Sequence, residues 1–113
     1  MSYIADTPVI LRAAASGTDF VPATTAQGIL LTKDLRYVIL DFNVGGTSPS
    51  WTVQPLFWNQ TAGQYFQGQA ITVNSDSRHI MEVMGCEDLY LYYSGVSGTN
   101  PTIEAYAIPV KVI

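Results

Sequence analysis

Short runs of β-branched and aromatic residues, separated by clusters of Gly, Pro, Asn and Ser, fill most of this 113-residue sequence. No long window has the apolar spacing of a helix, whereas several short runs alternate apolar and polar residues as half-buried strands do. A turn signal roughly every dozen residues is typical of sandwiches and barrels. The sequence therefore predicts an all-β fold, a β-sandwich or jelly-roll-like arrangement of antiparallel sheets with about eight short strands.

The predicted strands cover Val9–Arg12, Ile29–Thr32, Arg36–Val44, Trp51–Trp58, Gln69–Val73, Arg78–Met84, Asp88–Ser94 and Thr102–Val112. Alternation in the third strand places one set of residues on one face and a second set on the other, as in a half-buried strand. The first set is Val38, Leu40, Phe42 and Val44, and the second is Tyr37, Asp41 and Asn43. Leu89–Tyr93 is apolar on both faces, so either both faces are covered or one of them meets another subunit.

A single domain is expected from the length of the chain. Residues 1–28 are predicted to form an N-terminal arm with the first strand, and residues 29–113 the β-sandwich body. Within the arm, Ala13–Gly28 has the composition of a long loop. Pro55 and Pro109 cannot donate to a ladder, so each is expected on an edge or at a bulge.

Two segments share one design, in which a strand runs into Val-(Gly/Ser)-Gly-Thr-(Ser/Asn)-Pro and a second strand follows at once. They are Val44–Pro49 and Val96–Pro101. Glycine supplies positive φ, and Thr, Ser and Asn side chains bond their own backbone. We therefore predict two hairpin turns in equivalent places of the fold, the alternative being two unrelated turns that use the same common turn residues.

The charged fraction is unusually low, 12% against about 25% in typical soluble domains. A surface of uncharged polar groups loses little desolvation energy when it is covered, so it suits a protein that packs against others. A monomer with a nearly neutral surface is the alternative.

Charge and hydropathy also limit the partners. The net charge is −4 and the five basic residues are scattered along the chain, which argues against nucleic acid binding. The apolar runs are too short to cross a bilayer, and Met1–Asp6 lacks the features of a secretory signal. We expect synthesis in the cytoplasm and no membrane partner.

Catalytic roles find little support in the sequence. His79 is the only histidine, and its neighbours in an extended strand point to opposite faces, so a triad would need residues from distant segments. Cys86 lies beside two acids that raise a thiol pKa, which favours a structural role. A small β-sandwich enzyme that depends on His79 remains the third and weakest hypothesis.

Metal sites are equally weakly indicated. One cysteine and one histidine cannot build a structural zinc site within one chain. The acidic group Glu82, Glu87 and Asp88 is either a weak calcium site or a solvated turn, and it lacks the spacing of a calcium loop. We predict a protein that is not an enzyme, with no catalytic residues, no metal and no cofactor.

The two Gly-Thr motifs, together with Trp58–Gly63, resemble small β-sandwich structural proteins in the virions of tailed bacteriophages. That group includes capsid decoration (cement) proteins and head or tail accessory proteins. The likeness extends from Arg36 to the C-terminus, and the N-terminal third shows no pattern of the group. The resemblance implies a place in the virion, at the capsid surface, with the major capsid protein or another virion protein as partner.

These observations predict a decoration protein that forms a homo-oligomer, with a trimer favoured, and stabilises the capsid lattice after synthesis in the host cytoplasm. The alternative is a carbohydrate-binding β-sandwich module of a phage tail or cell-surface structure, in which exposed aromatic rings stack on sugars. The rings considered for this role are those of Trp51, Trp58, Tyr65, Phe66, Tyr90, Tyr92 and Tyr93. Of these, Trp51 is expected in the core. The candidate contact residues are Tyr3, Ile4, Phe20, Thr47, Trp58, Tyr90, Tyr92 and Thr99.

Overall fold

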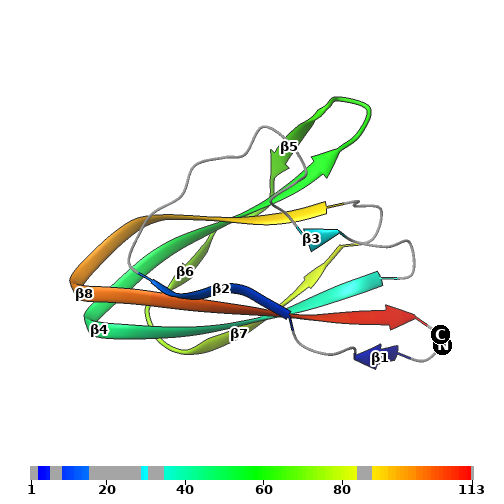
Figure 1. Ribbon diagram of the computed structural model, residues 1–113. Helices are drawn as coiled ribbons and strands as arrows, with labels where there is room; N and C mark the ends of the chain where they lie inside the picture. The colour runs from blue at the N-terminus through cyan, green and yellow to red at the C-terminus, as the bar shows by residue number, and fades with distance from the viewer. Residues whose placement is uncertain (1–2, 6–8, 16–28, 31–34, 84–87, 113) are drawn as a thin grey trace.

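Two long strands that pair with each other form the spine of the protein (Figure 1). The computed structural model describes residues 3–5, 9–15, 29–30, 35–83 and 88–112. Strand β4 (Leu35–Asn59) and strand β8 (Asp88–Val112) run antiparallel along nearly their whole length. The described residues form one eight-stranded antiparallel sheet and contain no helix. The prediction of an all-β antiparallel fold is confirmed.

The remaining strands are short and all pair with one of these two. On the β8 side lie β1 (Tyr3–Ala5), β2 (Val9–Ala15) and β3 (Ile29–Leu30). On the β4 side lie β5 (Gln64–Gln67), β6 (Ile71–Val73) and β7 (Ser77–Glu82). The outer strands thus depend on the central pair for their hydrogen bonds.

The prediction that Val44–Pro49 and Val96–Pro101 are hairpin turns is wrong. Each motif lies inside one continuous strand, so the predicted strands on either side of it belong to β4 in the first case and to β8 in the second. The two motifs lie opposite each other in the ladder, where Thr47 pairs with Thr99. Both strands bend here together, and the two-stranded ribbon folds back (Figure 1).

Residues with positive φ absorb the bend without reversing the chain. Gly46 and Gly98 have φ of 100° and 106°, and Ser48 and Asn100 have φ of 48° and 49°. The register shifts on both sides of the Thr47–Thr99 pair, as it does at β-bulges. Because the partner strand bends in the same way, the ladder continues through the corner.

The bend has a local two-fold symmetry that explains the repeated motif. The pair Gly45–Thr102 on one side of Thr47–Thr99 is matched by Ser50–Ser97 on the other. A Cβ atom on Gly46 would lie 2.5 Å from the Asn100 carbonyl oxygen, and one on Gly98 would lie 2.5 Å from that of Ser48. Each glycine therefore packs directly against the backbone of the other motif.

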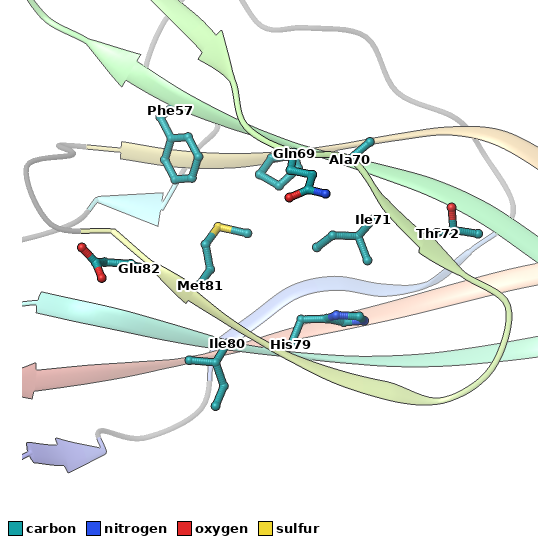
Figure 2. A pocket seen from close by; sticks show the side chains of 10 residues that line it. Phe57, Gln69, Ala70, Ile71, Thr72, His79, Ile80, Met81 and Glu82 are labelled. Atoms are coloured by element: carbon teal, nitrogen blue, oxygen red, sulfur yellow. The ribbon is translucent and has the colours of Figure 1, made fainter.

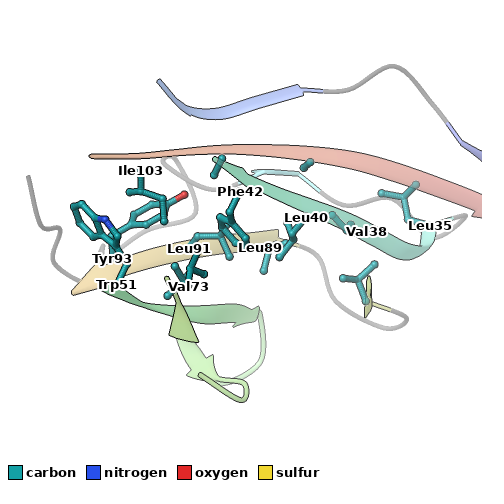
Figure 3. Packing of buried hydrophobic residues seen from close by; sticks show 14 residues of the cluster. Leu35, Val38, Leu40, Phe42, Trp51, Val73, Leu89, Leu91, Tyr93 and Ile103 are labelled. Carbon is teal, nitrogen blue, oxygen red and sulfur yellow. The ribbon is translucent and has the colours of Figure 1, made fainter. Parts of the chain in front are cut away.

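The bend divides the ribbon into two arms. The terminal arm comprises residues 35–44 and 103–112, and the hairpin arm comprises residues 51–59 and 88–96, named for the hairpin that β4 forms with β5. Side chains from both arms form one buried cluster (Figure 3). Of the residues that alternation placed on one face, Val38, Leu40 and Phe42 are buried, at most 1% exposed, whereas Val44 next to the bend is half-buried. Trp51, expected in the core, is fully buried.

Both prolines lie in central strands, so the expectation of an edge or a bulge is not met. Pro55 of β4 lies where the pairing partner changes, because β6 pairs up to Val53 and β5 pairs from Leu56. In β8, the pairing with β2 ends at Ala107 and the pairing with β1 begins at Val110, and Pro109 lies between them. A residue without an N–H is tolerated where the outer ladder is interrupted.

The N-terminal region contributes two strands to the edge of the sheet. The predicted strand at Val9–Arg12 is present and extends to Ala15 as β2, which also takes up the first residues of the predicted loop Ala13–Gly28. Strand β1 was not predicted, and it pairs with the end of β8. Residues 16–28, most of the predicted loop, lie outside the described residues.

Replacing the bend glycines should destabilise the whole fold. In Gly46→Ala or Gly98→Ala, the new Cβ meets a backbone carbonyl oxygen at 2.5 Å and the positive φ is strained, so each should lower the free energy of unfolding by about 3 kcal/mol. Gly63→Ala is the control, because its φ is +67° and nothing lies within 4 Å of the new atom; it should cost about 1 kcal/mol. Urea denaturation measures both, and equal losses would contradict the close packing of the two motifs.

Candidate functional site

The predicted contact residues do not form one patch. Those that the structure describes lie in three places: Tyr3 on β1, Thr47 and Thr99 at the bend, and Trp58, Tyr90 and Tyr92 on the hairpin arm. Phe20 and the side chain of Ile4 lie outside the described part of the chain. Tyr3 is 49% exposed and packs edge-on against Tyr37, with ring centroids 5.8 Å apart.

The bend presents a small polar tip. Thr47 and Thr99 are both exposed and face each other across the ladder. Their neighbours at the tip are glycine, serine and asparagine, without a charged or aromatic side chain. Such a tip offers hydrogen bonds and a close approach to the backbone, but little apolar area.

The hairpin arm carries an aromatic face, which we define as Trp58, Tyr65, Tyr90 and Tyr92, all half-buried. The Trp58 and Tyr65 rings meet edge-on with centroids 5.1 Å apart, and Tyr65 lies 6.2 Å from Tyr90. The Trp58 Nε1–H donates a 2.7 Å hydrogen bond to Gln60 Oε1, which orients the indole. The contact residues predicted from the sequence include Trp58, Tyr90 and Tyr92 but not Tyr65.

The other aromatic residues considered for sugar stacking divide clearly. Trp51 and Tyr93 are at most 3% exposed and belong to the core, so they cannot form a platform. Phe66, by contrast, is 47% exposed on β5. On the aromatic face itself the rings partly cover one another, which limits the open ring area to that of half-buried side chains.

The outer face of the terminal arm carries a feature that the sequence alone did not indicate. Ile39 of β4 pairs with Ile80 on one side and with Ile108 on the other, so these isoleucines form a row across β7, β4 and β8. We call Ile80, Ile39 and Ile108 the isoleucine row. Ile80 is 68% exposed, and the other two are half-buried. The row depends on strand register, which no single segment of sequence encodes.

The charges of Arg78 and Asp41, next to the isoleucine row, are paired with each other. Arg78 donates from Nε and Nη2 to the two carboxylate oxygens of Asp41, at 2.6 and 2.8 Å. This hydrogen bonding lowers the pKa of Asp41 and raises the pKa of Arg78. A hydrogen bond with Glu104 raises the pKa of Tyr106, and Glu104 also accepts from Asn43 Nδ2 at 2.9 Å.

A groove of about 590 Å³ runs between β6 and β7 (Figure 2). Its apolar lining includes Phe57, Ile71 and Met81. His79 also faces it, with Nε2 3.1 Å from Ser77 Oγ, and its ring centroid lies 5.8 Å from that of Phe42. Residues two apart on a strand share a face, so His79 meets Ser77, a relation that the prediction from its adjacent neighbours missed.

The groove does not assemble a hydrolytic triad from the described residues. None of their carboxylates is in hydrogen-bond contact with His79, and Asp76 instead accepts a 2.9 Å bond from the Val44 N–H, which ties the β6–β7 turn to the bend. A nucleophile and base also need a third group that orients the base. The absence of catalysis remains a prediction.

No group of three or more His, Cys, Asp and Glu residues that could hold a metal ion gathers in the described part of the chain. Cys86 and Glu87, singled out from the sequence, lie outside that part. Among the described residues no helix has the length and apolar character needed to cross a membrane.

Comparison with known proteins adds no relative. No family model, no curated protein and no solved structure matches the chain. A functional proposal therefore depends on the surfaces described above.

The Asp41–Arg78 pair should make stability depend on pH in a defined direction. Because the pKa of Asp41 is lowered in the folded state from its ordinary value of 3.8, the pair stabilises the fold above that value and the contribution disappears as pH falls through the folded-state pKa. Wild type should therefore be modestly more stable than Asp41→Asn at neutral pH, with the difference vanishing in acid. Urea denaturation over a pH series measures this, and a difference that grows as pH falls would contradict it.

Proposed function

We propose that this protein is a structural protein of a tailed-bacteriophage virion, most specifically a capsid decoration protein that binds and stabilises the major capsid protein lattice. The observation that carries the proposal is the isoleucine row, an apolar strip on an outer sheet face of a chain with only 12% charged residues. Contiguous apolar side chains at the surface mark interaction sites when they form a patch, and here the exposed Ile80 continues into the half-buried Ile39 and Ile108. The resemblance of the Gly-Thr motifs supports the choice of a virion.

The proposed architecture is a β-sandwich folded from one ribbon, whose layers are the terminal arm and the hairpin arm. Both arms contribute to one buried cluster, and the ladder between β4 and β8 runs from one arm into the other. Such a body would transmit load through backbone hydrogen bonds and a shared core. This property suits a clamp between capsid subunits.

The mechanism of the proposed decoration protein is mechanical. A contact of standard size, about 1,600 Å² in total, repeated over a particle surface would resist internal pressure without any single strong site. The isoleucine row supplies apolar area, and the bend tip supplies hydrogen-bonding groups. Association of several copies is part of the proposal.

Carbohydrate binding is the second candidate, and the aromatic face is the observation that favours it. On one face of the hairpin arm, the Tyr65 ring lies between those of Trp58 and Tyr90, at centroid distances of 5.1 and 6.2 Å. Rings grouped in this way can contact the apolar faces of sugars. Binding to a glycan array that Trp58→Ala abolishes, without binding to capsids, would favour this candidate.

Capsid binding tests the first candidate directly. Capsids of the phage that encodes the chain, assembled without it, should bind the purified protein stoichiometrically and symmetrically in electron micrographs. Ile108→Lys, which alters the isoleucine row away from β7, should weaken binding about tenfold or more, since burying an isoleucine contributes about 1.5–3 kcal/mol.

Asn74→Lys, which adds the same charge at an exposed turn position, is the matched control and should bind as wild type. Circular dichroism should show that both variants keep the β fold. Capsids that remain bare at every protein concentration would overturn the proposal.

A further inference from the structure

Strand β7 is a regular edge strand. It pairs with β4 at consecutive positions from Ser77 to Glu82 without a bulge, and no other strand of the described residues pairs with it. Its sequence contains no proline, glycine or lysine. Natural proteins usually protect open edges with proline, with lysine or other charged side chains, with bulges or with a covering segment. Of these devices β7 has only the charges of Arg78 and Glu82, which are exposed and opposite in sign. A regular edge whose charges can complement each other is suited to pairing with another strand.

The ladder geometry shows which backbone groups of β7 point outward. The Val83 N–H donates to the Arg36 carbonyl at 2.9 Å, just beyond the end of β7. Hydrogen-bonding groups alternate in direction along an antiparallel strand. The backbone N–H and C=O groups of residues 77, 79 and 81 therefore point to β4. The same groups of Arg78, Ile80 and Glu82 point to the open edge.

The side chains of the same three residues also face outward. Arg78, Ile80 and Glu82 are exposed, whereas the alternate residues of β7 are half-buried. In Figure 2, the side chains of Ile80 and Met81 leave β7 in opposite directions. The open edge thus combines three outward-pointing pairs of backbone groups with a basic, an apolar and an acidic side chain in that order.

This order is self-complementary in one register. We infer that two copies of the chain pair through their β7 strands, antiparallel, about a two-fold axis at Ile80. Ile80 then lies opposite Ile80 of the second copy. Arg78 of each copy lies opposite Glu82 of the other, so the contact contains two Arg78–Glu82 pairs. Centring the same hydrogen-bonding pattern on Arg78 or on Glu82 would instead place like charges opposite each other.

Arg78 is held in place for this contact. Its Nε and Nη2 bind Asp41, which leaves Nη1 for a carboxylate of the second copy. A guanidinium that is already ordered loses less side-chain entropy when it forms a further hydrogen bond. The pair of copies would contain this interaction twice because the contact is symmetric.

The pairing joins two sheets into one. The order of strands becomes β8–β4–β7 followed by the same strands of the second copy in reverse, and the isoleucine row doubles in length across the junction. A two-fold contact closes on itself and gives even-numbered assemblies, so the edge of β7 favours a dimer over the trimer expected from the sequence. This dimer would form in solution, whether or not the protein binds capsids.

Charge exchange tests the register. Wild type should sediment as a dimer at micromolar concentration. Glu82→Arg places arginine opposite arginine, and Arg78→Glu places glutamate opposite glutamate, so each variant alone should dissociate at least tenfold more readily. An equimolar mixture of the two variants should form a heterodimer. One copy then carries arginine and the other glutamate at positions 78 and 82, so each of the two cross-strand pairs joins opposite charges.

Two further variants separate pairing from folding. Ile80→Pro removes an N–H that points to the open edge and none that bonds β4, so it should be a folded monomer by circular dichroism. Asn74→Arg, a charge change off the edge, should remain a dimer. A wild-type monomer, a trimer, or a dimer that persists in Glu82→Arg would overturn the inference. A charge-sensitive dimer that leaves capsids bare would uphold it and end the proposed function instead.

Discussion

The pairing of β4 with β8 through their shared bend is the interaction on which the rest of the structure depends. All the other described strands hydrogen-bond to one of these two, and the buried cluster forms because the bend brings the inner faces of both arms together. The bend needs Gly46 and Gly98, since each lies against a carbonyl oxygen of the other motif with no room for a side chain. A sequence repeat thus produces a symmetric contact between two strands.

Patterns within single segments of the sequence predicted the properties that depend on those segments alone, such as which side chains are buried. Alternation grouped Val38, Leu40 and Phe42 on one face of the terminal arm, which the structure buries, and Trp51 is in the core as expected. The two motifs were misassigned because positive φ at glycine serves a chain reversal and a strand bend equally well. The choice between them is made by the partner motif, which lies far away in the sequence. The positions of Pro55 and Pro109 depend in the same way on where outer strands end.

The candidate surfaces show the same division. Trp58, Tyr90 and Tyr92 were predicted as contact residues from their type, and the structure places them on one face with Tyr65, although half-buried. The isoleucine row could not be predicted, because strand register aligns Ile39 with Ile80 and Ile108. The open edge of β7 could not be predicted either, because it depends on which strands pair. Both features join apolar or complementary groups on a weakly charged exterior. Together they favour a protein that works by association.

The paired bend can be tested most directly by nuclear magnetic resonance in solution. The structure predicts cross-strand Overhauser contacts between Thr47 and Thr99 and between Gly45 and Thr102, which pair across β4 and β8. Two independent hairpins would instead give backbone contacts between residues on the two sides of one motif, such as Val44 and Trp51, and no contacts between the two motifs. Observing the second pattern would contradict the continuous bent ribbon and the account of the core and surfaces that follows from it.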